Sequence, residues 1–149
     1  MKLTEICTPE VISCAADITA LHAARLMRER HVGDLVVVDE SGEDPAPIGI
    51  VTDRDIVVEV LAKDLDPAKV TVRDIMRVPL VIARASEEAE NALERMRVHG
   101  VRRVPVVDDA SKLVGVLSLD DLIRRLAADA VTLADIVARE QDHEHRVRR

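Results

Sequence analysis

Two short motifs place a hydroxyl three residues before a carboxylate, each at a point where an apolar strand passes into a helix. The pairs are Thr52 with Asp55 and Ser118 with Asp121, and a glycine stands three residues before each hydroxyl. The start of a helix offers free N–H groups and a positive dipole to an anion, and a carboxylate there can accept hydrogen bonds from both hydroxyls of a ribose. The same spacing is that of a capping box, in which the two side chains only stabilise the helix start. From the spacing alone, the nucleotide-binding and the capping interpretation both stay open.

Two adjacent arginines, Arg102 and Arg103, stand before an apolar strand in the second half of the chain. Two guanidinium groups suit phosphate oxygens, although the same residues could also pair with acids on the surface of an acidic protein. The corresponding positions of the first half hold Gly33 and Asp34, and a carboxylate would repel phosphate. We therefore expect two unequal clefts, with phosphate favoured on the side of the arginines. Arg54 is a further candidate for phosphate binding.

An internal duplication positions both motifs. Met27 and Met96 lie 69 residues apart (96 − 27), and at this offset the apolar positions of two helical patterns coincide. Each set follows the spacing i, i+3, i+4, i+7, which predicts one buried face of a helix. Asp17 and Ser86 are residue types that cap helix starts, and we expect them to begin the two helices. The coinciding residues are Ala20, Ala23, Ala24 and Met27 in the first half and Ala89, Ala92, Leu93 and Met96 in the second.

The order of the elements predicts a mixed α/β (α+β) fold, with two pseudo-symmetric β-α-β-β-α repeats packed as one module. We expect leading strands at 11–13 and 80–82, central strands at 35–39 and 104–108, and closing helices at 54–62 and 120–128. The predicted divisions are a first repeat at 5–62, a linker at 63–73, a second repeat at 74–128, and a C-terminal helix with a polar tail at 129–149.

The composition fits a folded protein and excludes several classes of function. The chain has 149 residues, 48% of them apolar and 33% charged, and it contains no Phe, Trp or Tyr. Without aromatic side chains it lacks stacking platforms for single-stranded nucleic acid, and its net charge of −7 opposes binding to duplexes. No apolar run reaches the roughly 18 residues of a membrane span, and Glu5 precedes any apolar region, which argues against a signal peptide. We therefore expect a cytoplasmic protein that binds neither nucleic acid nor membrane.

No group of residues predicts catalysis or a metal site. The chain contains no G-x-S-x-G, no P-loop lysine motif, no H-E-x-x-H and no G-x-G-x-x-G. Cys7 and Cys14 have no neighbouring histidine, and we expect reduced core residues rather than a zinc site or a redox pair. His143 and His145 resemble metal ligands, but they stand in a charged tail without a third ligand. We expect no enzyme, because the two repeats also leave no room for a catalytic domain.

The two motifs, GIVTDRD at 49–55 and GVLSLDD at 115–121, resemble the signature glycine-apolar-x-Ser/Thr-x-x-Asp/Asn of the CBS (cystathionine-beta-synthase) domain. The segments DIM at 74–76 and VPVVD at 104–108 add to this resemblance, which covers about residues 5–128. The chain is similar to a tandem CBS domain pair, the Bateman module. It is similar in particular to small stand-alone bacterial CBS-pair proteins that carry the sequence TDRDIV, found here at 52–57.

The resemblance implies an adenosyl ligand, such as AMP, ADP, ATP, an NAD-type dinucleotide or S-adenosylmethionine, in the cleft between the repeats. It implies that Asp55 and Asp121 hold ribose hydroxyls, and that Thr52 and Ser118 contact phosphate or ribose. The base would lie against apolar residues at 9–12 and 78–82, and no metal is expected. The candidate binding residues are therefore Thr52, Arg54, Asp55, Ser118, Asp120, Asp121, Arg102, Arg103, Ile12, Pro79 and Val81.

Two functions from different classes fit this pattern. The first is a regulatory module, in which a bound ligand biases the packing of the repeats and a partner protein responds to the change. The resemblance also implies a homodimer formed through helices, with the exposed faces at 20–27 and 89–96 and those of the closing helices as candidate contacts. The alternative is a homodimeric structural or protein-interaction adaptor that does not bind nucleotide, in which both motifs act only as caps.

Overall fold

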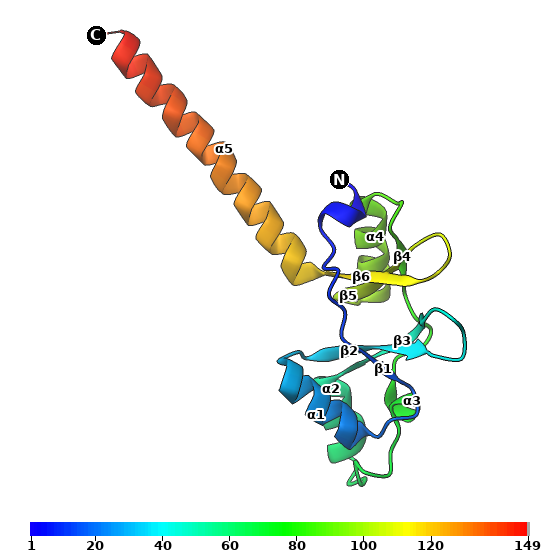
Figure 1. Ribbon diagram of the computed structural model, residues 1–149. Coiled ribbons are helices and arrows are strands. Elements are labelled where there is room, and N and C mark those ends of the chain that lie inside the picture. Colours follow the sequence, from blue (N-terminus) through cyan, green and yellow to red (C-terminus); the bar gives the residue numbers. More distant parts are fainter. Residues whose placement is uncertain (149) are drawn as a thin grey trace.

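The computed structural model describes residues 1–148 and shows two similar halves, one above the other, with a long helix projecting from the second half (Figure 1). Each half contains a three-stranded sheet, in which the first strand runs parallel to the central strand and the third runs antiparallel to it. The predicted fold of two mixed α/β repeats is confirmed. The strands are β1 (Ser13–Ala15), β2 (Asp34–Asp39) and β3 (Ala46–Thr52) in the first half, and β4 (Ala83–Arg84), β5 (Arg103–Val107) and β6 (Leu113–Ser118) in the second.

The helices also occur at equivalent places, except at the end of each repeat. The first repeat closes with a short α-helix that continues into a π-helical segment, whereas the second closes with a single long α-helix. The elements are η1 (Leu3–Glu5), α1 (Ala20–Arg30), α2 (Asp53–Ile56), the π-helical segment η2 (Val57–Leu61), α3 (Val72–Ile75), α4 (Ala89–His99) and α5 (Leu119–Val147).

The helices α1 and α4 begin later than the sequence predicted. Thr19, not Asp17, is the N-cap of α1, and its hydroxyl accepts a hydrogen bond of 3.1 Å from the backbone N–H three residues on. Glu88, not Ser86, precedes α4. Thr19 and Glu88 each lie in an isolated β-bridge to another segment. The chain is therefore extended at these residues, and each helix can begin only after them.

The apolar face predicted for both helices is confirmed. In α1 and in α4, the first, fourth and eighth residues are buried, and the fifth is partly buried against the same core. Each helix covers a sheet whose central strand is almost entirely buried. Because no aromatic side chain is available, the two cores consist of aliphatic residues, methionine and alanine. The largest fully buried side chains are those of Leu3, Leu35 and Leu117.

Each repeat is completed by a segment that precedes the other repeat in the chain. Leu3 and Ile6, at the N-terminus, pack into the core of the second repeat, and Val72 and Ile75, from the connection between the halves, pack into the core of the first. These two pairs stand at the same offset of 69 residues (72 − 3 and 75 − 6) as the duplicated helices. The two crossing segments, residues 2–8 and 71–77, therefore join the repeats into one packed unit.

Several boundaries differ from the sequence prediction. The leading strands begin two and three residues later than expected, at Ser13 and Ala83. The closing helix of the second repeat does not end near residue 128 but continues as α5 to Val147, through the predicted C-terminal helix and most of the predicted polar tail. No Gly or Pro occurs between Leu119 and Val147, so nothing in this stretch interrupts the helix. Within the described chain, no helix has both the length and the apolarity to cross a membrane.

Both cysteines are free thiols that pack into the cores. Cys14 belongs to the first core, and Cys7 packs against the second, where its side chain lies close to Gly115. Burial raises the pKa of the Cys14 thiol to about 11 and also raises the pKa of Cys7. Both side chains are therefore neutral and unreactive near neutral pH.

Leu3 lies near the chain terminus, yet we expect it to contribute as much stability as a central core residue. Its side chain is 0% exposed, so Leu3→Ala should leave a cavity and lower the free energy of unfolding by about 2–5 kcal/mol. Leu65→Ala is the control, because that side chain is 46% exposed, and its cost should stay within about 0.5 kcal/mol. Urea unfolding followed by far-UV circular dichroism measures both. Equal stabilities of the two variants would show that the N-terminal segment does not close the second core.

Candidate functional site

The two residues of each motif are joined by hydrogen bonds at a helix start. The Thr52 hydroxyl accepts a hydrogen bond from the Asp55 backbone N–H (3.1 Å), and an Asp55 carboxylate oxygen accepts one from the Thr52 N–H (2.9 Å). At the second motif, the Ser118 hydroxyl accepts from the Asp121 N–H (3.0 Å) and donates to the Asp121 carboxylate (2.6 Å). Both motifs therefore cap the helix that follows them, whether or not they also bind a ligand.

The carboxylate of each motif also binds a side chain from a crossing segment. Arg77 Nε donates to Asp55 Oδ1 at 3.3 Å, and the Thr8 hydroxyl donates to Asp121 Oδ2 at 3.2 Å. Thr8 and Arg77 stand at the same 69-residue offset (77 − 8). In each repeat, one residue of a crossing segment thus binds the carboxylate to which the resemblance assigns the ribose. Neither residue was predicted from the sequence, in which only the offset of 69 relates the two positions to each other.

The larger cleft lies between the two repeats and has a volume of about 570 Å³. This volume is typical of sites for small molecules. The start of α2 forms one side, the residues before β5 form the other, and the segment before β4 supplies an apolar wall. Seven of the candidate residues line it: Thr52, Arg54, Pro79, Val81, Arg102, Arg103 and Asp120.

A second cleft of about 280 Å³ lies between the repeats at the start of α5. Ile12, Ser118 and Asp121 line it, together with Arg103 and Asp120, which it shares with the larger cleft. Asp55 lines neither cleft. It faces a separate hollow of about 260 Å³ beside Arg77. The structure therefore distributes the eleven candidate residues over three places, and it brings most of them to the larger cleft.

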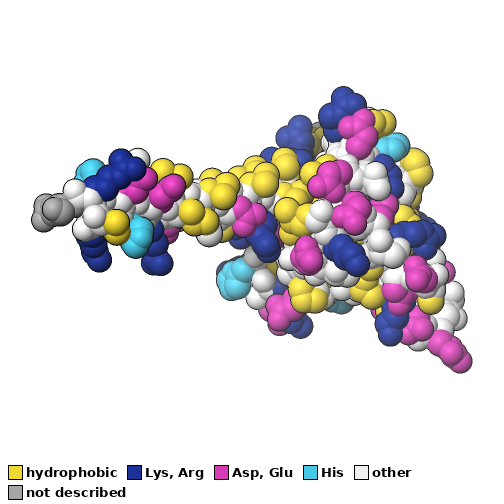
Figure 2. Space-filling view, turned by 90° about the horizontal axis from the view of Figure 1, so that it is seen from above, with side chains coloured by type: hydrophobic (Ala, Val, Ile, Leu, Met, Phe, Trp, Pro, Cys, Tyr) yellow, Lys and Arg dark blue, Asp and Glu magenta, His cyan; other side chains and the backbone are white. Residues whose placement is uncertain are grey.

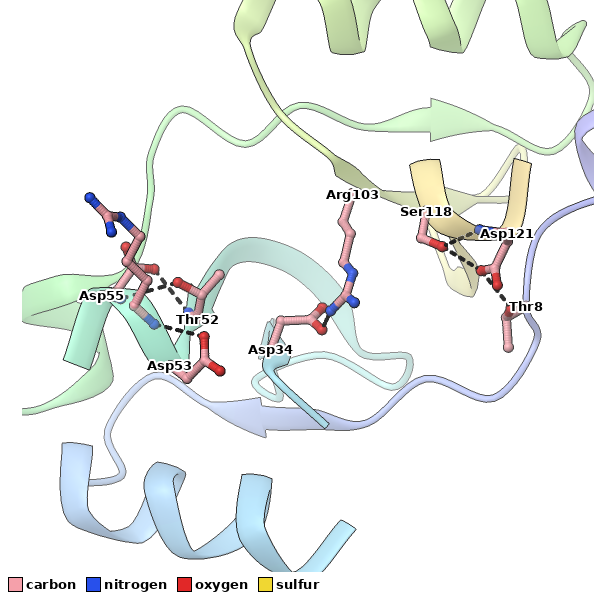
Figure 3. Close-up of polar contacts among 9 residues, drawn as sticks. Thr8, Asp34, Thr52, Asp53, Asp55, Arg103, Ser118 and Asp121 are labelled. Carbon is pink, nitrogen blue, oxygen red and sulfur yellow. Dashed lines mark hydrogen bonds and ion pairs between the residues drawn. The ribbon is translucent and has the colours of Figure 1, made fainter. Parts of the chain in front are cut away.

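The two clefts are separated by an ion pair between the repeats. Arg103 contacts Asp34, and both residues line both clefts. Figure 3 shows this pair midway between the Thr52 motif and the Ser118 motif. The side chain of Asp34 is 13% exposed and that of Arg103 is 38% exposed. The sequence places an acidic residue, Asp34, opposite a basic one, Arg103, at equivalent positions of the two repeats. In the structure the charges of these two side chains neutralise one another.

The other two arginines of the larger cleft are more accessible. Arg102 is 73% exposed and forms an ion pair of 3.1 Å with Asp120. Arg54 forms no ion pair within residues 1–148, so its guanidinium is available to a ligand. The same part of the chain contains no cluster of three or more His, Cys, Asp or Glu side chains that could hold a metal ion. The larger cleft thus combines arginines, aspartates and the Thr52 hydroxyl with an apolar wall.

Comparison with known proteins identifies the same two repeats. The family model of the CBS domain matches residues 3–62 and 72–128. A protein of Methanopyrus kandleri, described as uncharacterized, is 37% identical over 124 residues, which are 83% of this chain and 62% of that protein. Hypoxic response protein 1 of Mycobacterium tuberculosis is 35% identical over 121 residues, which are 80% of this chain and 82% of that protein. The chain therefore spans less than two thirds of the first relative and most of the second.

The fold is also similar to that of solved structures. One of them is a CBS domain pair in complex with 5′-methylthioadenosine and S-adenosyl-L-methionine. It has a TM-score of 0.73 and 27% sequence identity, and the similarity covers 87% of this chain and 98% of that one.

We expect the Asp34–Arg103 pair to stabilise the contact between the repeats. A double-mutant cycle with Asp34→Asn and Arg103→Gln should give a coupling free energy above about 1 kcal/mol, because Asp34 is largely buried and would otherwise lack a counter-charge. The control is the cycle of Arg102→Gln with Asp120→Asn in the same cleft, whose more exposed pair should couple by about 0.5 kcal/mol or less. Urea unfolding of the wild type and of the single and double variants measures both coupling free energies. Equal coupling in the two cycles would contradict the special role of the central pair.

Proposed function

Because the chain belongs to the CBS domain family, we propose that it is a non-catalytic regulatory module that binds an adenosyl ligand between its two repeats. Ligand binding would change the packing of the repeats, and a partner protein would respond to that change. The observation that carries this proposal is the cleft of about 570 Å³, where Arg54 and Arg102 face an apolar wall. A related CBS domain pair binds two adenosyl compounds, which supports the same class of ligand.

The lining of the larger cleft suggests how such a ligand would lie. Arg54, Arg102 and the Thr52 hydroxyl would contact phosphate oxygens. The base would rest on the apolar wall near Pro79 and Val81, because no aromatic side chain is present for stacking. Four arginines and three aspartates line the cleft, which gives a formal charge of +1 (4 − 3). This balance favours a ligand with one phosphate or none over a triphosphate.

Asp55 would link the ligand to the packing of the repeats, because the hollow that it faces shares Arg54 and Arg77 with the larger cleft. To hold a ribose, its carboxylate would exchange the bond from Arg77 Nε (3.3 Å) for the ribose hydroxyls. Arg77 lies at the end of the segment that closes the core of the first repeat. Release of Arg77 would therefore pass the binding event to that core, which is the kind of differential contact that a conformational signal requires.

The alternative is a structural or protein-interaction adaptor without a nucleotide. Two observations favour it: Asp34 neutralises Arg103, and both motif carboxylates already have protein partners. Under either function we expect a cytoplasmic protein that forms a homodimer.

We expect an adenosyl ligand to bind and to raise the unfolding midpoint. Isothermal titration with AMP, ADP, ATP, NAD and S-adenosylmethionine should show saturable binding to at least one, with AMP favoured over ATP. Arg54→Ala together with Arg102→Ala should weaken AMP binding roughly tenfold or more, because charge-assisted contacts to phosphate are lost. Arg28→Ala, on the exposed side of α1, is the control and should have no effect. Absence of heat and of a midpoint shift with all five compounds would favour the adaptor.

A second test separates capping from ligand binding at the motif carboxylates. Asp55→Ala combined with Asp121→Ala should lower stability by about 1 kcal/mol per cap under both functions. Only for the regulatory module should the same change also abolish binding of the ligand found by titration. The Thr19 hydroxyl caps α1 away from both clefts and from the hollow at Asp55, so Thr19→Ala is the control for the loss of a cap. Unchanged affinity in the double variant would restrict both motif carboxylates to a structural role.

A further inference from the structure

The helix α5 leaves the body of the protein after its first turn. Leu122 is its only buried residue within the described chain, and the helix then projects away from both repeats (Figure 1). The first repeat behaves differently at the corresponding place. Gly49 and Gly115 set an offset of 66 residues there (115 − 49), so Leu126 corresponds to Val60. Val60 is 0% exposed, whereas Leu126 is 59% exposed. The side chain at this position is therefore buried in the first repeat and exposed to solvent in the second.

The exposed part of α5 carries an apolar stripe, which we define as Ile123, Leu126, Ala130, Leu133 and Val137. The steps between these residues are 3, 4, 3 and 4, which is the spacing of the a and d positions in a coiled coil. All five residues are exposed, and Leu133 reaches 65%. In the space-filling view, hydrophobic side chains extend along α5 next to the body, and charged side chains gather at its far end (Figure 2).

The charged residues of the same stretch lie away from the α5 stripe. At 100° per residue, they fall on the sides and back of the helix when the stripe faces forward. Between 122 and 138 they are Arg124, Arg125, Asp129 and Asp135. The stripe ends where Glu140 and Glu144 take over its a and d positions. About four turns of helix are therefore adapted to an apolar partner.

A second copy of the same helix fits this surface better than the other partners do. A heptad stripe is the pattern by which helices pair with similar helices. A membrane surface does not fit, because amphipathic helices that bind anionic lipid have basic polar faces, whereas residues 119–147 hold seven acidic and four basic residues. The chain's own body does not fit either, because α5 has no Gly or Pro at which it could fold back.

The size of the stripe agrees with a dimer contact. Two copies of it, with the neighbouring Ala127, Ala134 and Ile136, would bury roughly 1,000 Å² in total, which is about the least that a specific interface needs. Of the dimer contacts that the resemblance offers, the closing helix of the second repeat holds the first two residues of the stripe, whereas the outer faces of α1 and α4 are less suitable. Their exposed side chains are charged or polar, apart from Val98.

We propose that two copies of this chain pair through their α5 stripes, forming a helical contact that begins at the end of the second CBS repeat and continues beyond it. This contact does not depend on whether the clefts bind a ligand. It assigns the assembly of the protein to a helix on which Ala130, Leu133 and Val137 lie beyond the duplicated repeats.

Sedimentation velocity of the full chain tests the proposal with matched variants. Leu126→Glu combined with Leu133→Glu places two charges in the stripe. Ala128→Glu combined with Thr132→Glu adds the same charge to the opposite side of the same helix. We expect the wild type and the opposite-side variant to sediment with at least twice the mass of one chain. The stripe variant should have half the mass of the wild type. Its far-UV circular dichroism should also show less helix, because an isolated helix is marginally stable in water.

Three results would overturn the proposal. The first is a monomeric wild type at concentrations up to those of the circular dichroism experiment. The second is a stripe variant that keeps the wild-type mass. The third concerns the exposed patch of Val57, Val58, Leu61 and Leu65 around η2. If Leu61→Glu dissociated the wild-type assembly as completely as the stripe variant does, α5 would dock on that patch instead of on a second α5.

Discussion

The structure depends on the exchange of covering segments between the two repeats. Leu3 and Ile6 complete the second core, and Val72 and Ile75 complete the first. Neither repeat can bury its apolar surface without a segment that precedes the other repeat in the chain. The relative position of the repeats is therefore determined by the same contacts that stabilise each core, and the clefts between them are part of the packing. A ligand in a cleft would act on this packing directly, without a separate relay.

The central ion pair sets the electrostatic character of both clefts. Arg103 provides a positive charge at the boundary between the clefts, and Asp34 cancels most of it. For a ligand with phosphate, the net attraction would therefore come from residues farther out, chiefly Arg54, which has no protein counter-charge in the described part of the chain. A phosphate that reached Arg103 would compete with Asp34 and would weaken a contact between the repeats. The Asp34 carboxylate would thus oppose highly charged ligands. A ligand that did reach Arg103 would loosen the packing of the two repeats.

Sequence reasoning predicted the duplicated elements because their signals are local. The helical faces of α1 and α4 and the hydroxyl–carboxylate pairs follow from spacings of three and four residues, and the structure contains both. The helix starts were wrong because β-bridges from distant segments extend the chain at Thr19 and Glu88. The partners Thr8 and Arg77 were missed for the same reason, since a contact over 113 or 22 residues leaves no local pattern. The continuity of α5 was missed because this stretch was divided into a closing helix at 120–128 and a C-terminal helix with a polar tail at 129–149, although no Gly or Pro separates them.

The two motifs are alike in sequence but differ in the contacts that a ligand would have to replace. Asp55 binds Arg77, at the end of the segment that closes the first core, and lines neither cleft between the repeats. Asp121 binds the Thr8 hydroxyl, lies 3.9 Å from Arg124 and lines the smaller cleft. A ribose would therefore reach Asp121 through that cleft, whereas a ribose at Asp55 would have to enter the hollow beside Arg77. The same motif thus stands in two different surroundings, and occupation of Asp55 would disturb the first core more directly.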